Sequence, residues 1–140
     1  MQLKFKVNAK IQKPVEEVFD AVYNPQKLSS YFTTGGANAP LDAGQTVIWQ
    51  FADHPGDVEV KVEQTVPNRL IAFGWGEQHV RIEFEPLDND STLVSISEGE
   101  WPETQKGLDR SYGNCHGWTQ MSCCLKAYVE HGINLRQGFY

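Results

Sequence analysis

Apolar residues near the end of the chain recur at the spacing of an amphipathic helix. Between Asn114 and Gly132 they fall at Trp118, Met121, Leu125, Tyr128 and Val129. Steps of three and four residues place such side chains on one face of a helix. Asn114 or Ser111 is expected to cap the start, and Gly132 to end the helix in the left-handed conformation. This broad, partly aromatic stripe needs a large apolar surface on which to pack.

The first third of the chain predicts a strand and two short helices. Residues from Leu3 to Ile11 alternate between apolar and polar, which is typical of a strand with one wet face. Pro14 suits the first turn of a helix, and Val15, Val18, Phe19 and Val22 follow at helical spacing until Asn24-Pro25 interrupts the pattern. A second helix is predicted over roughly Gln26–Tyr31.

The middle of the chain predicts strands. The segment Thr33–Pro40 contains Gly35-Gly36 and is expected to be a mobile loop. Five strands should follow, over Thr46–Phe51, Val58–Val66, Leu70–Trp75, His79–Leu87 and Thr92–Glu98. Short turns between them indicate an antiparallel meander. The polar segment Trp101–Gly113 is interpreted as a connection to the last helix, and Ile133–Tyr140 is left unassigned.

Together these elements predict an α+β protein with a helix-grip architecture. A curved antiparallel sheet of about six strands wraps around the C-terminal helix, and residues 1–140 form a single domain. A bent sheet under one helix seldom closes at both ends. We therefore expect a cavity between them, of the kind that binds small apolar molecules.

Composition narrows the class of partner and the compartment. The formal net charge is −6 and no basic patch is visible, so nucleic acid is not an expected partner. No apolar run approaches the ~20 residues of a membrane span, and no secretion signal begins the sequence. The three cysteines, Cys115, Cys123 and Cys124, do not suggest a disulfide framework, which favours a cytoplasmic location.

Two local patterns carry a resemblance to a known family. The first runs Pro14-Val15-Glu16-Glu17-Val18-Phe19 and continues through Asn24-Pro25, Leu28 and Tyr31-Phe32. The second is Gly117-Trp118, then Met121, Leu125, Tyr128-Val129-Glu130 and Gly132. With the element order, they resemble the START-like (SRPBCC) superfamily. Within it the chain is similar to the group named for the C-terminal domain of the activator of the Hsp90 ATPase (AHSA1-like).

The resemblance implies a ligand cavity more firmly than it implies a reaction. The eukaryotic co-chaperone of this group has an additional N-terminal domain that does much of the Hsp90 binding, and no segment of this chain corresponds to it. We therefore expect Hsp90 not to be a partner. A homodimer is left open, and no cofactor is expected. The leading hypothesis is a non-enzymatic binding protein for a small hydrophobic ligand or lipid.

The candidate ligand-binding residues lie on the predicted strands and on the last helix. They are Trp49, Phe51, Phe73, Trp75, His79, Phe84, Trp118, Met121 and Leu125. Aromatic side chains supply large contact areas for flat or lipidic ligands. The competing interpretation for each apolar member is ordinary core packing.

Two alternative functions are kept. A cyclase- or hydratase-like enzyme would need a cavity acid or base, for which His79 is the first candidate and Glu98 the second. His79 is out of phase with Val80, Ile82 and Phe84, so a surface position is the simpler interpretation. The other alternative is a stress-related interaction module like the co-chaperone.

Metal binding and cysteine catalysis have weaker support in the sequence. Cys115-His116, Cys123-Cys124 and His131 share one helix and do not supply four converging ligands, so no metal site is predicted. Cys115 beside His116 is the best placed nucleophile, although packing explains the cysteines more simply.

Overall fold

The computed structural model describes residues 1–140 and contains three helices and seven strands. In chain order these are β1 (Leu3–Ile11), α1 (Val15–Tyr23), α2 (Pro25–Leu28), β2 (Gly36–Ala37), β3 (Thr46–Phe51), β4 (His54–Val66), β5 (Leu70–Trp75), β6 (Gln78–Leu87), β7 (Ser91–Trp101) and α3 (Gln105–His131). The helix-grip α+β class predicted from the sequence is confirmed. The predicted strand β1, helix α1 and strand β5 are also found.

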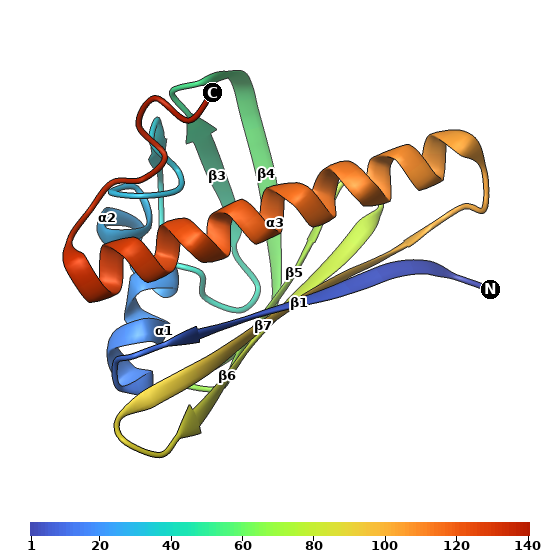
Figure 1. Ribbon diagram of the computed structural model, residues 1–140. Helices are drawn as coiled ribbons and strands as arrows, with labels where there is room; N and C mark the ends of the chain where they lie inside the picture. The colour runs from blue at the N-terminus through green and yellow to red at the C-terminus, as the bar shows by residue number, and fades with distance from the viewer.

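All seven strands form one antiparallel sheet in the order β1-β7-β6-β5-β4-β3-β2. The first strand therefore closes the meander by pairing with the last strand, as in the register Phe5 to Glu98 and Val7 to Ile96. Figure 1 shows the twisted sheet with α3 running across it, while β3 and β4 extend past the helix on one side. The two short helices lie near the C-terminal end of α3, with α1 below it and α2 behind it in this view.

The start of α3 differs from the prediction. The helix begins at Gln105 and has 27 residues, so most of the expected connection Trp101–Gly113 is helical. Its cap is Thr104, whose hydroxyl accepts a hydrogen bond from the N–H of Gly107 at 3.0 Å, and not Asn114 or Ser111. At 1.5 Å per residue the helix is about 40 Å long. Gly132 ends it in the left-handed conformation, as predicted.

Three smaller differences concern the loops and strand ends. The expected loop Thr33–Pro40 contains the two-residue strand β2, which pairs with Gln50 and Trp49 of β3. The second helix is shorter than predicted and ends at Leu28. Strands β4 and β7 are longer than expected. Sheet pairing begins already at the polar residue His54 in β4, and in β7 it continues past Glu98 to Gly99 and Trp101.

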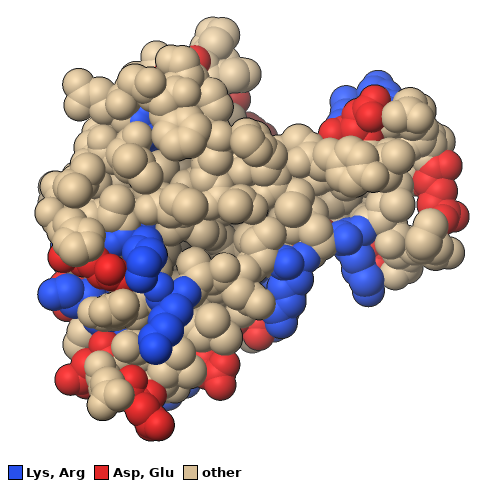
Figure 2. Space-filling model, viewed as in Figure 1, with Lys and Arg blue, Asp and Glu red and all other residues tan.

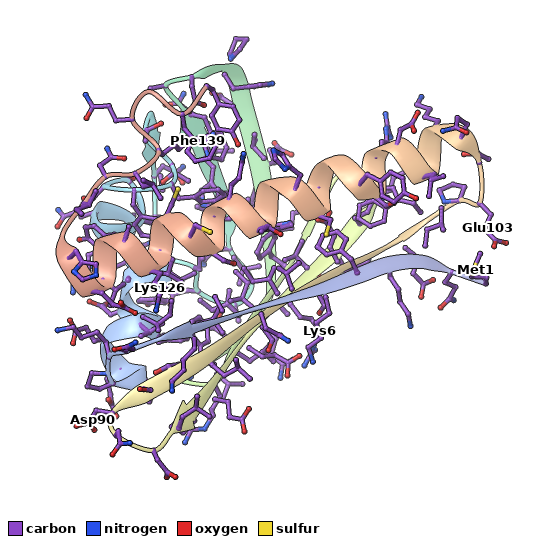
Figure 3. All side chains as sticks on the ribbon, in the orientation of Figure 1. Met1, Lys6, Asp90, Glu103, Lys126 and Phe139 are labelled. Atoms are coloured by element: carbon purple, nitrogen blue, oxygen red, sulfur yellow. The ribbon has the colours of Figure 1, made fainter.

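A single cluster of buried apolar residues joins the sheet to the helices. From α3 it contains Trp118, Met121, Cys124 and Leu125, each at most 2 % exposed. On the other side of α3, Lys126 is directed at β1 (Figure 3), where its ammonium donates to the carbonyl of Lys10 at 2.7 Å. No helix combines the length and hydropathy needed to cross a bilayer.

Candidate functional site

A cavity of about 520 Å³ lies where α3, β3, β4 and the C-terminal segment meet. Its apolar lining consists of Phe32, Phe51, Val58, Trp75, Trp118 and Tyr140. The polar or small lining residues are Asp53, His54, Gly113, Asn114, Gly117 and Arg136. His54, Gly113 and Tyr140 are exposed, so the cavity opens to solvent along one rim. Figure 2 shows few charged side chains on the surface above the middle of α3 and the C-terminal segment.

The walls are built from aromatic rings in mutual contact. The indoles of Trp75 and Trp118 lie 5.3 Å apart between ring centroids, and Phe32 packs 5.7 Å from Trp118 and 5.2 Å from Phe51. The strands fix the sheet side of this wall because every second residue faces inward. Trp118 is held by the apolar stripe of α3. Two sides of the wall are therefore built on regular secondary structure, the sheet and α3.

The helix side of the cavity is unusually flat. Gly113 and Gly117 are four residues apart within α3, so they share a face. A Cβ atom built at either position would meet no heavy atom within 4 Å. Glycine inside a helix costs about 0.5–1 kcal/mol relative to alanine, and no contact within this chain requires it at these two positions. The helix backbone is left bare where it borders the cavity.

A buried carboxylate lies directly behind this wall. Glu98 of β7 is 2 % exposed. It accepts hydrogen bonds from Trp75 Nε1 at 2.7 Å, Trp118 Nε1 at 2.8 Å and Asn114 Nδ2 at 3.0 Å. All three donors belong to residues that line the cavity. Glu98 therefore sets the orientation of both indoles and turns their N–H groups away from the cavity.

The C-terminal segment contributes Arg136 and Tyr140 to the cavity lining. Arg136 donates from Nε and Nη2 to the two carboxylate oxygens of Asp53, at 2.8 and 2.9 Å. The guanidinium also lies over the rings of Phe51, Phe32 and Tyr140, at 4.8, 5.5 and 4.9 Å from their centroids. Figure 1 shows this segment returning from the end of α3 beside β2 and β3, and Figure 3 labels Phe139 on it above the helix.

The two carboxylates of the site have opposite electrostatic environments. Burial raises the pKa of Glu98, and the hydrogen bonds from Trp75, Trp118 and Asn114 offset only part of that effect. The hydrogen bonds from Arg136 lower the pKa of Asp53. Asp53 is neutralised by its bidentate partner, whereas Glu98 has no cationic partner within salt-bridge distance.

The predicted site residues separate into three groups. Phe51, Trp75 and Trp118 line the cavity. Trp49 and Phe73 are buried one layer behind it, with Trp49 5.4 Å from Phe73 and 6.1 Å from Trp75. Phe84, Met121 and Leu125 are core residues away from the lining, and Phe84 packs against Phe19 at 5.2 Å.

His79 lies outside the cavity, so its use as a cavity residue was wrong. Its ring Nδ1 is 2.8 Å from a carboxylate oxygen of Glu63, and its side chain is 68 % exposed. Val80 and Ile82 are fully buried, and neighbouring residues of a strand point to opposite faces. His79 is therefore on the outer face of the sheet.

Sequence reasoning missed Asp53, His54, Asn114 and Arg136. Asn114 was noticed only as a cap, and Arg136 lay in the unassigned tail. The one available signal was the pair Gly113 and Gly117, since two glycines four residues apart inside a long helix need an explanation. No group of three or more His, Cys, Asp or Glu side chains converges in the structure.

The stability of the protein should depend on the ionisation of Glu98. Because its folded-state pKa is raised, Glu98 keeps its proton to a higher pH in the folded chain than in the unfolded chain, where a free glutamate titrates at about pH 4.3. This group's contribution to stability is full below that pH and is lost as the pH rises through the folded pKa. Urea unfolding of wild type and Glu98→Gln can be compared across pH 4–8. The free energy of unfolding of wild type minus that of Glu98→Gln should fall as the pH rises. A flat difference would contradict the raised pKa.

The fold and the cavity place the chain in the START-like, helix-grip class of proteins. The family model for "Activator of Hsp90 ATPase homolog 1-like protein" matches residues 12–130. The chain therefore belongs to this family, as the resemblance of its two local patterns suggested. No curated protein matches the sequence.

Several proteins with solved structures are similar to this chain in fold. SSP2350 from Staphylococcus saprophyticus is 26 % identical, with a TM-score of 0.85 over 95 % of this chain and 96 % of that chain. DynU16, from the dynemicin biosynthetic locus, is 20 % identical, with a TM-score of 0.83 over 96 % of this chain and 49 % of that chain. The Aha1 dimer from Colwellia psychrerythraea is 17 % identical, with a TM-score of 0.73 over 92 % of this chain and 97 % of that chain.

Proposed function

We propose that this chain is a single-domain binding protein for a small, flat, apolar molecule held between α3 and strands β3–β5. The observation that carries the proposal is the bare helix surface at Gly113 and Gly117, in a cavity that the indole of Trp75 also lines. Selection for folding alone favours alanine at such positions. A planar ligand that lies against the helix backbone would be blocked by the added methyl groups.

Replacing Gly117 with alanine separates this function from a structural role. The variant should be as stable as wild type or up to about 1 kcal/mol more stable, because helix propensity improves and no atom is displaced. Its affinity for a flat neutral fluorophore, N-phenyl-1-naphthylamine, should fall severalfold because the methyl group occupies the cavity. Urea unfolding and fluorescence titration measure the two quantities.

The matched control is Cys123→Ala, an exposed position on the same helix and outside the cavity lining. It should bind the fluorophore as wild type does. A wild-type protein that gives no saturable fluorescence change, or a Gly117→Ala variant with unchanged affinity, would contradict the proposal.

An enzymatic function finds its only support in Glu98. That carboxylate is bonded to three residues of the wall and does not itself line the cavity, which favours binding over catalysis. The stress-related role, a homodimer like that of the Colwellia protein, and the cytoplasmic location stay predictions.

A further inference from the structure

The carboxylate of Glu98 is buried without a cation, directly behind residues that line an open cavity. Removing a charged carboxylate from water is costly unless a cation or enough hydrogen bonds compensate it. Its partners Trp75, Trp118 and Asn114 are all neutral donors. Orienting two indole N–H groups needs only a neutral acceptor. When Glu98 is ionised, no cation within the chain therefore balances its negative charge.

Glu98 also has acceptor capacity left. A carboxylate offers about four lone-pair positions. Oε2 is shared by Trp75 and Asn114, whereas Oε1 accepts only from Trp118. One of the three present donors is replaceable as well, because Asn114 is only half-buried and its amide makes no other hydrogen bond. Either carboxylate oxygen of Glu98 can therefore accept a hydrogen bond from a ligand.

The aromatic wall suits a positive charge. Cations bind over the faces of tryptophan and phenylalanine rings. The chain already places one cation in this cavity, the guanidinium of Arg136 on Phe51, Phe32 and Tyr140. That cation is paired with Asp53, so it does not balance an ionised Glu98.

We propose that the cavity selects planar apolar amines, whose ammonium group pairs with Glu98 by replacing the side-chain amide of Asn114. This inference rests on the function proposed above and names the ligand class of the same cavity. The aromatic part of the ligand lies on the bare helix surface at Gly113 and Gly117. The ammonium donates to Glu98 Oε2 between the two indoles.

Asn114 has room to move aside. Its neighbour Gly113 and the next turn's Gly117 have open space at the Cβ position. A second hollow of about 450 Å³ lies next to the first and shares Val58, Trp75 and Asn114 with it. The amide of Asn114 can rotate into that hollow without leaving the helix surface.

The test compares two probes that share one aromatic system. Tryptamine carries an ammonium group and 3-methylindole does not. Calorimetric titration of the wild type should show tryptamine binding at least about tenfold more tightly, as one hydrogen bond to a charged group provides. In Glu98→Gln the ratio of the tryptamine affinity to the 3-methylindole affinity should fall towards one. In Asn114→Ala, which removes the competing amide and keeps Glu98, the ratio should rise about threefold or more.

Each result decides the inference. Equal wild-type affinities, a ratio that survives in Glu98→Gln, or an unchanged ratio in Asn114→Ala would overturn it. If Glu98→Gln does not fold, Asn114→Ala decides alone. Binding of N-phenyl-1-naphthylamine without any preference for tryptamine would refute the amine selectivity and leave the proposed function standing. If none of the three probes binds the wild-type protein, both the amine selectivity and the proposed function are refuted.

Discussion

Replacing Leu125 with alanine should lower the free energy of unfolding by about 2–5 kcal/mol. Leu125 is fully buried at the centre of the face that α3 presents to the sheet. Removing its branched end deletes apolar contacts and leaves a void that the rigid surroundings fill only in part. Because α3 also forms one wall of the cavity, binding of N-phenyl-1-naphthylamine should weaken in parallel.

The control for this prediction is Cys123→Ala, two positions earlier on the same helix and exposed to solvent. Its free energy of unfolding should stay within about 0.5 kcal/mol of wild type. Urea denaturation followed by far-ultraviolet circular dichroism measures both variants. A loss below about 1 kcal/mol for Leu125→Ala would mean that α3 does not pack against the sheet as described.

The second large effect is expected at Gly107 in the first turn of α3. A Cβ atom at this position would lie 2.0 Å from the carbonyl oxygen of Pro102, so the backbone must move to admit any side chain. Overpacking of this kind costs about 1–3 kcal/mol, and more where backbone has to shift. This cost exceeds the gain of about 1 kcal/mol in helix propensity. Gly107→Ala should therefore be destabilised by about 2 kcal/mol.

Gly113→Ala is the matched variant on the same helix. It has no neighbour within 4 Å of the added Cβ and should be neutral or stabilised by up to about 1 kcal/mol. Thermal unfolding should therefore shift in opposite directions for the two substitutions. Two variants of equal stability would show that α3 does not approach Pro102 closely. The contact matters for the site because it sets where α3 begins above the sheet.

The long last helix was predicted only over its last two thirds, from Asn114 onward. Its first turns, from Gln105 to Tyr112, are mostly polar and carry no apolar stripe, and Gly107 lowers their helix propensity. They are helical because Thr104 caps them and because Gly107 packs on Pro102. Both features depend on where β7 ends and on the direction in which the chain leaves it.

The cavity was predicted in outline and only partly in its residues. Phe51, Trp75 and Trp118 were found because strand and helix periods show which side chains face inward. The same period places His79 on the outer face, since Val80 beside it is buried. Glu98 was considered as the second candidate for a cavity acid or base, but a solvated strand end was the favoured interpretation. Sequence alone does not reveal that β7 continues to Trp101 and carries Glu98 beneath the helix.

The sequence by itself determined the types of element, their order and the α+β class, because those follow from local periodicity, turn residues and helix ends. The tertiary structure alone decided which side chains meet. Arg136 and Asp53 are 83 residues apart, and Glu98 is 16 and 20 residues from Asn114 and Trp118. Such pairings depend on the twist of the sheet and on the angle at which α3 crosses it. Both result from the packing of the sheet against the helix and cannot be read from any single segment.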